Sequence, residues 1–75
     1  MSEDKIKKYD TLMKAKEYKK AGEIVFENFF EMPELTDIAI KYHQKILSSK
    51  DEKNKKLYEE QTPGELIVLL ESNYK

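Results

Sequence analysis

Apolar residues recur along this chain at the spacing of α-helices, and they predict an all-α bundle of four or five short helices. Residues 3–16 carry a single apolar stripe between lysines, which is typical of a surface helix with one face on the core. Residues 18–31 continue in the same rhythm and predict a second helix. Neither glycine nor proline separates the two, so we expect a turn at residues 14–17, with one longer helix as the alternative. The two stripes consist of Ile6, Tyr9, Leu12 and Met13, and of Tyr18, Ala21, Val25, Phe29 and Met32.

Pro33 marks the next boundary. The residue before a proline is pushed out of the helical region, and proline can itself occupy the first position of a new helix. Gly22, inside the second predicted helix, is unfavourable there by about 1 kcal/mol relative to alanine unless close packing requires the missing side chain. The third predicted helix has the cleanest amphipathic pattern in the chain, and its stripe consists of Leu35, Ile38, Ala39, Tyr42 and Ile46.

Two helix-start signals follow in the C-terminal part of the chain. Ser49, with an acid three residues later, reads as a capping box, after which residues 50–61 form a charged arm that is helical or frayed. Thr62 is expected to be the N-cap of a last helix, with Pro63 at its first position. The apolar run at residues 66–70 could instead be a buried strand. No second strand-like run is present to pair with it, so a helix is favoured.

The whole chain, residues 1–75, is expected to form one helical domain. It contains no cysteine, which excludes disulfides and thiolate metal sites. No N-terminal apolar run resembles a secretory signal, and the longest apolar run is far shorter than the roughly 20 residues of a membrane-spanning helix. We therefore expect a cytoplasmic protein that does not interact with a membrane.

Charge is unevenly distributed, although lysines and acids nearly cancel over the whole chain. Residues 21–40 contain five acidic residues and no lysine, whereas residues 1–20 contain seven lysines and four acids. The chain has no arginine, the side chain that most often reads guanine edges and pairs with phosphates. This distribution disfavours nucleic-acid binding and makes residues 21–40 an acidic block.

A small set of positions around the first two predicted helices follows a known spacing. Tyr18 opens the second helix, and the small Ala21 follows three residues later. The larger Val25 comes four residues after that, and Pro33 closes the unit. This spacing, within residues 5–38, resembles one tetratricopeptide repeat. The resemblance implies a helical hairpin, with protein binding as the habit of that family.

Candidates for catalysis or metal binding are few. A Ser-His-acid set could be assembled only from His43, Ser48 or Ser49, and Asp51. The serines are expected to close one helix and cap the next, and His43 is expected at a helix boundary, partly packed and partly solvated. The acids of residues 23–34 recur every three or four residues and are expected to form a solvated face. We therefore expect a protein that is not an enzyme, binds no metal and needs no cofactor.

All three phenylalanines lie in the acidic block. On a helical wheel at about 100° per residue, Phe26 and Phe30 lie about 100° from the apolar cluster that contains Phe29. The resulting face is roughly 160° wide, broader than the approximately 100° that one neighbouring helix covers. In one interpretation, Phe26 and Phe30 pack on the C-terminal helix. In the other, they stay accessible and form a partner-binding site, with Glu23 and Glu27 as its acidic rim.

The second interpretation predicts a non-catalytic module for protein–protein interaction, such as an adaptor, an inhibitor or an assembly subunit. Its partner would present an apolar slot with a basic rim. Because the first twenty residues are rich in lysine, self-association as a homodimer is one form of this prediction.

The alternative is a small helix-turn-helix DNA-binding regulator. In it, residues 34–46 would form the first helix of the motif, and the lysines of residues 50–56 would lie near phosphates. The acidic excess, the lack of arginine and the absence of a glycine turn after Tyr42 disfavour this alternative.

Overall fold

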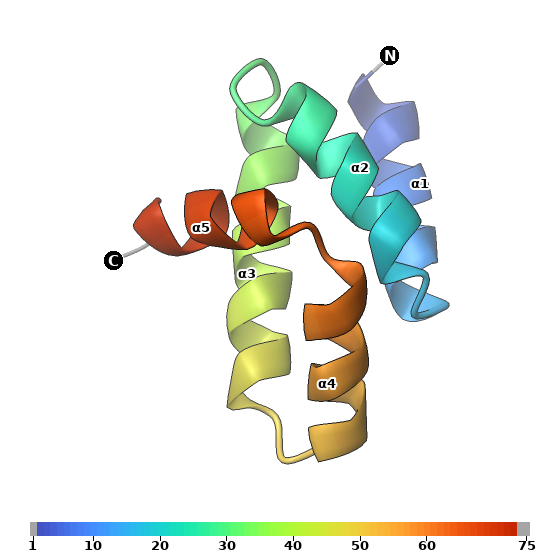
Figure 1. Cartoon of the computed structure of the whole chain (residues 1–75). Coiled ribbons are helices and arrows are strands. Elements are labelled where there is room, and N and C mark those ends of the chain that lie inside the picture. The colour runs from blue at the N-terminus through green and yellow to red at the C-terminus, as the bar shows by residue number, and fades with distance from the viewer. Residues whose placement is uncertain (1, 74–75) are drawn as a thin grey trace.

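The computed structural model describes residues 2–73 and contains five helices and, among those residues, no strand. It confirms the all-α fold class. α1 and α2 form an antiparallel hairpin, α3 and α4 run side by side in opposite directions, and α5 crosses α3 (Figure 1). The helices are α1 (Ser2–Lys14), α2 (Tyr18–Asn28), α3 (Pro33–Ser48), α4 (Glu52–Gln61) and α5 (Gly64–Ser72).

A residue in the left-handed region separates α1 from α2. Lys16 has a φ of 61°, a conformation often found just after the end of a helix. Its N–H donates to the carbonyl oxygen of Met13 at 3.1 Å. The next N–H, of Glu17, donates to the carbonyl oxygen of Leu12 at 2.9 Å. These two bonds form a Schellman motif, which satisfies the last carbonyls of α1. The predicted turn at residues 14–17 is confirmed, and the alternative of one long helix is wrong.

α2 ends at Asn28, earlier than the sequence pattern predicts, and residues 29–32 turn toward α3. Thr36 fixes this turn, because its hydroxyl donates to the carbonyl oxygen of Phe29 at 2.5 Å. Pro33 begins α3, as predicted. The early end of α2 takes Phe30 out of the helix and into the turn, which decides where its ring lies.

α4 is a helix over most of the predicted charged arm, but its cap differs from the prediction. The N-cap is Asp51, whose carboxylate accepts the N–H of Asn54 at 3.1 Å. Ser49 lies two residues earlier, and its hydroxyl oxygen accepts the N–H of Asp51 at 3.0 Å. The predicted capping box between Ser49 and Glu52 is therefore wrong, because Ser49 sits in extended backbone two residues before the cap.

The start of α5 also differs from the prediction. Thr62 ends α4, donating its N–H to the carbonyl oxygen of Tyr58 at 2.9 Å. The N-cap of α5 is Pro63, whose carbonyl oxygen accepts the N–H of Leu66 at 3.0 Å. Thr62 is therefore not the N-cap, because the chain needs extended backbone at both residues to turn the corner between the helices. Residues 66–70 are helical, so the strand alternative is wrong.

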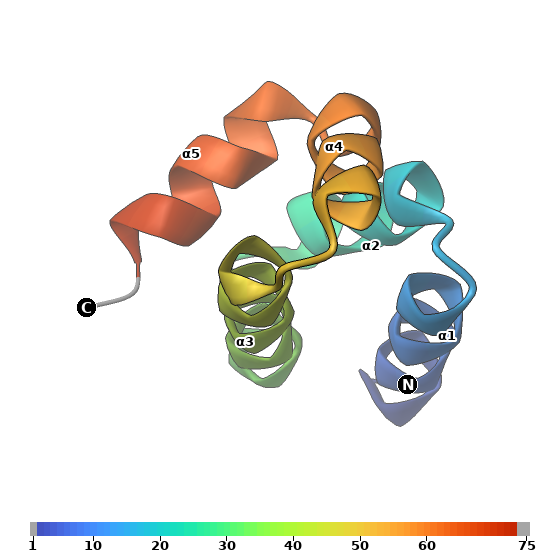
Figure 2. The ribbon, with the colours of Figure 1, turned by 90° about the horizontal axis from the view of Figure 1, so that it is seen from below.

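The core receives side chains from all five helices. Gly22 belongs to its close packing, because a Cβ atom added there would lie 3.0 Å from Cδ of Pro63 and 3.3 Å from Cδ2 of Leu66. The missing side chain lets α2 approach the start of α5. Seen from below, α1 and α3 lie along one side of the molecule and α4 and α5 along the other, with α2 behind them (Figure 2). The buried apolar residues are Tyr9, Met13, Tyr18, Ala21, Val25, Phe29, Leu35, Ala39, Ile46, Tyr58, Leu66 and Leu70.

Candidate functional site

The side chains that the sequence singled out as a partner-binding site lie at the surface. Phe30 is 80% exposed and Phe26 is 41% exposed, whereas Phe29, between Phe30 and Asn28 in the chain, is 5% exposed. The interpretation in which both outer rings are packed away against the C-terminal helix is therefore wrong. We call Phe26 and Phe30, with the exposed Glu23 and Glu27 beside them, the aromatic face.

The local fold explains why Phe29 is buried and its neighbour Phe30 is exposed. Phe29 turns its ring into the core, and its carbonyl oxygen is held by Thr36. Phe30, one residue further along the turn, is exposed, and its ring contacts the ring of Phe29. Their ring centroids are 5.2 Å apart and their planes are inclined by 75°, an edge-to-face arrangement. One side of the Phe30 ring thus has a support, and the rest is open to solvent.

The acidic side chains around the aromatic face form no ion pair with another residue of the described range 2–73. A nearby amide, Asn28, does bind a lysine: Lys5 Nζ donates to its Oδ1 at 3.1 Å. That contact faces α1, so it leaves the acidic rim unneutralised. The acids concerned are Glu23, Glu27, Glu31 and Glu34, and all are exposed.

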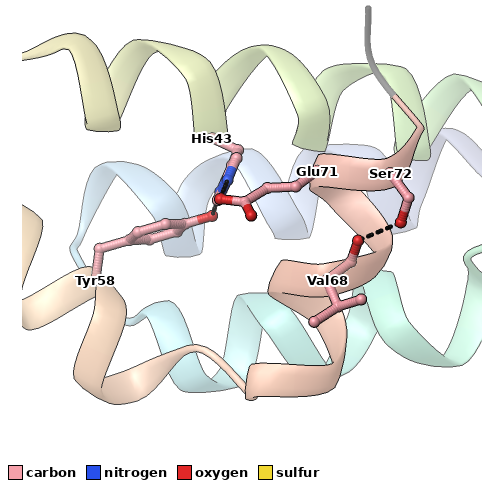
Figure 3. Close-up of polar contacts among 5 residues, drawn as sticks. All are labelled: His43, Tyr58, Val68, Glu71 and Ser72. Atoms are coloured by element: carbon pink, nitrogen blue, oxygen red, sulfur yellow. Dashed lines mark hydrogen bonds and ion pairs between the residues drawn. The ribbon is translucent and has the colours of Figure 1, made fainter.

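His43 forms a second polar cluster, and here the sequence-based prediction is wrong. The side chain is fully buried, with 0% exposure, instead of lying half-solvated at a helix boundary. Its Nδ1 lies 2.5 Å from the hydroxyl of Tyr58, and its Nε2 lies 3.3 Å from Oε2 of Glu71 (Figure 3). These partners come from α4 and α5, far along the chain, and periodicity within one helix carries no trace of them.

The protonation pattern of this cluster follows from its partners. The Glu71 carboxylate can only accept, which places the proton of a neutral imidazole on Nε2 and leaves Nδ1 to accept the Tyr58 O–H. The Glu71 side chain is 50% exposed, while the His43 side chain is enclosed. The cluster therefore ties α3, α4 and α5 together, and it presents no imidazole to a substrate.

The structure does not assemble the other chemistry considered from the sequence. Ser49 hydrogen-bonds to the N–H of Asp51, and the ring nitrogens of His43 bond elsewhere. Within residues 2–73 no three His, Asp or Glu side chains lie close enough together to hold a metal ion. None of the helices in that range combines the length and apolar character needed to cross a membrane.

Sequence reasoning missed a hollow on the surface of α3. Ile38 and Tyr42, both half-buried, form its floor, and the exposed Lys41 and Lys45 form its rim. We call these four residues the lysine-rimmed slot; the hollow has a volume of about 250 Å³. The signal was present in the sequence as two parallel pairs at i and i+4, one apolar and one basic, on the edge of the amphipathic helix.

Comparison of the chain with known protein families, with curated proteins and with solved structures finds no match. The resemblance to a tetratricopeptide repeat therefore stays a prediction.

Proposed function

We propose that this chain is a non-catalytic protein-binding module and that it acts as an adaptor, an inhibitor or an assembly subunit. Its docking site is the aromatic face, with Phe26 and Phe30 as apolar anchors and Glu23 and Glu27 as the rim. The observation that carries the proposal is the 80% exposure of Phe30 beside acids that form no ion pair among the described residues.

The chemistry of the face suits a protein partner. Interfaces are enriched in aromatic side chains at their centres, and the surrounding charges steer the encounter and exclude wrong partners. Phe29 already supports one side of the Phe30 ring, so the Phe30 side chain loses less conformational freedom when a partner binds. The partner should offer an apolar slot with a basic rim, and a bound ring would exchange water for apolar contacts.

The DNA-binding alternative receives no support from the arrangement of its helices. In a helix-turn-helix the two helices cross at roughly 90–120°. In this chain α3 and α4 run alongside each other in opposite directions (Figures 1 and 2). We therefore do not extend the proposal to nucleic acid.

Selection from a random peptide library displayed on phage tests the proposal even though the partner is unidentified. We expect the wild-type chain to enrich peptides in which an apolar residue is flanked by lysine or arginine. Binding of those peptides should weaken at least about tenfold with Phe26→Ala/Phe30→Ala, since anchors at an interface centre typically contribute more than about 1 kcal/mol each.

Val68→Ala is the matched control, because Val68 is an exposed apolar residue on another helix, 64% accessible. It should leave peptide binding unchanged. Circular dichroism would establish that each variant is folded. Selected peptides that bind the Phe26→Ala/Phe30→Ala variant as tightly as the wild type would contradict the assigned site.

A further inference from the structure

The slot that the aromatic face requires is present on this same chain. The lysine-rimmed slot has an apolar floor, Ile38 and Tyr42, and two lysines, Lys41 and Lys45, on its edge. Neither lysine forms an ion pair with another residue of the range 2–73. The acidic rim of the aromatic face is unpaired in the same way, so the two surfaces are complementary in both polarity and charge.

Tyr42, one of the two residues in the floor of the slot, is held in place by contacts with α1. The Tyr42 hydroxyl donates to the Asp10 carboxylate, and the Tyr42 ring meets the Tyr9 ring edge-on, with centroids 5.8 Å apart. A second hollow shares Tyr42 and Lys45 with the slot and is also lined by Met13 and Ile46, so the two hollows adjoin. A preformed hollow binds its ligand with less loss of side-chain freedom than one that must form on binding.

The aromatic face and the slot lie on different sides of the molecule. Tyr42 turns toward α1, where it contacts Asp10 and Tyr9. Gly22 packs against the start of α5, and Phe26, one helical turn further along α2, lies on that same side. Figure 2 shows α1 and α5 on opposite sides of the molecule. A chain cannot place its own aromatic face in its own slot, so the two surfaces can meet only between two copies.

We propose that the aromatic face of one copy docks into the lysine-rimmed slot of a second copy, with Phe30 over Ile38 and Tyr42 and the acidic rim against Lys41 and Lys45. The inference rests on the proposed function and identifies the partner. Because the two surfaces differ and face different ways, the contact is head-to-tail, and each added copy exposes a fresh slot or face. Association should therefore continue past the dimer as concentration rises, and it should weaken with salt.

Sedimentation velocity over a concentration series tests this arrangement with two variants. The face variant is Phe26→Ala/Phe30→Ala, and the slot variant is Lys41→Glu/Lys45→Glu. Each should need at least about tenfold more protein than the wild type to associate, because each removes one side of the contact. Lys50→Glu/Lys53→Glu is the charge-matched control, since both lysines are exposed and lie outside the slot; it should associate as the wild type does.

Mixing the two variants gives the sharpest result. The face variant still has a slot and the slot variant still has a face, so an equimolar mixture should form a 1:1 dimer that does not grow further. This recovery would also show that both variants are folded. A mixture that stays monomeric while the wild type associates would overturn the head-to-tail contact.

A wild-type chain that remains monomeric up to about 1 mM, a concentration at which even contacts of about 4 kcal/mol are half-formed, would overturn the second copy as partner. The peptide selection decides the proposed function separately. Peptides that depend on Phe26 and Phe30, found together with a monomeric wild type, would retain the docking site and refute only its occupation by a second copy.

Discussion

Tyrosine hydroxyls connect the helices at the scale of single residues. Tyr18 donates to Oδ1 of Asn54 at 2.6 Å, linking α2 to α4, and Tyr42 donates to Asp10, linking α3 to α1. Each ring lies against the core while its hydroxyl finds a partner on another helix. Such residues supply apolar area and a directional bond at once, which helps a small core specify one arrangement of its helices.

The bond between Tyr42 and Asp10 makes stability depend on pH. The Tyr42 hydroxyl, with help from the Lys14 ammonium, lowers the pKa of Asp10 below its ordinary value. The pKa of Tyr42 is raised to about 12, mainly by burial and to a smaller extent by the bond to Asp10. The contribution of Asp10 to the free energy of unfolding is therefore complete above about pH 4 and is lost as the pH falls through the lowered pKa. The Tyr42 contribution is complete below about pH 10 and is lost as the pH rises through about 12.

We expect Tyr42→Phe to reduce the free energy of unfolding at pH 7 by less than about 1 kcal/mol, because the Asp10 side chain is 39% exposed and solvent weakens the bond. The difference in free energy of unfolding from the wild type, measured in urea titrations, should be the same at pH 5 as at pH 7, and it should be smaller at pH 3, where protonation of Asp10 removes part of the contribution. Tyr18→Phe is the control, since its partner Asn54 does not titrate and its cost should not follow the same trend. A Tyr42→Phe cost that is constant from pH 7 to pH 3 would contradict this assignment.

The sequence predicted the surroundings of some residues of the candidate site better than those of others. The helical wheel placed Phe26 and Phe30 outside the main stripe but left open whether they are packed or accessible, and the structure shows both exposed. The burial of His43 could not be anticipated, because its partners Tyr58 and Glu71 lie 15 and 28 residues further along the chain. A hydrogen bond between distant helices leaves no periodic signal.

At the scale of the elements, local chemistry predicted which helices exist better than where each begins. Pro33 begins α3 because proline suits the first turn of a helix. The N-cap of α4 was harder to predict, because Ser49 and Asp51 are both good N-cap residues and only one of them can occupy that position. Thr62 was misassigned for a related reason: the corner between α4 and α5 sets its backbone, and a capping motif cannot override that corner.

The two glycines give a matched test of how closely α2 and α5 pack. Alanine at Gly22 would gain up to about 1 kcal/mol in helix propensity, but its Cβ would meet Cδ of Pro63, part of a rigid ring, at 3.0 Å. Gly64 has no atom within 4 Å of an added Cβ. We expect Gly64→Ala to raise the free energy of unfolding by about 0.5 kcal/mol, and Gly22→Ala to leave it unchanged or lower it. Urea denaturation that finds Gly22→Ala the more stable variant would contradict the close packing.

At the scale of the whole molecule, the arrangement of the helices creates features that no single segment contains. The all-α class was predictable from amphipathic stripes, whereas the pairing of α3 with both α4 and α5 depends on contacts between distant parts of the chain. The hollow that adjoins the lysine-rimmed slot is lined by side chains of α1, α2, α3 and α4, so it too depends on the fold. The proposed head-to-tail contact belongs to this scale, because it uses surfaces on two sides of the molecule.

The central claim is that the Phe30 ring stands open to a partner and contributes little to the fold. Urea unfolding of Phe29→Ala and Phe30→Ala, neighbours of identical type, tests it at protein concentrations where the chain is monomeric. Phe29 is 5% exposed, and its loss should lower the free energy of unfolding by about 3 kcal/mol or more. Phe30 is 80% exposed, and its loss should cost less than about 1 kcal/mol, mostly through the edge contact with Phe29. Equal costs for the two variants would mean that the chain itself shields Phe30, and that result would contradict the claim.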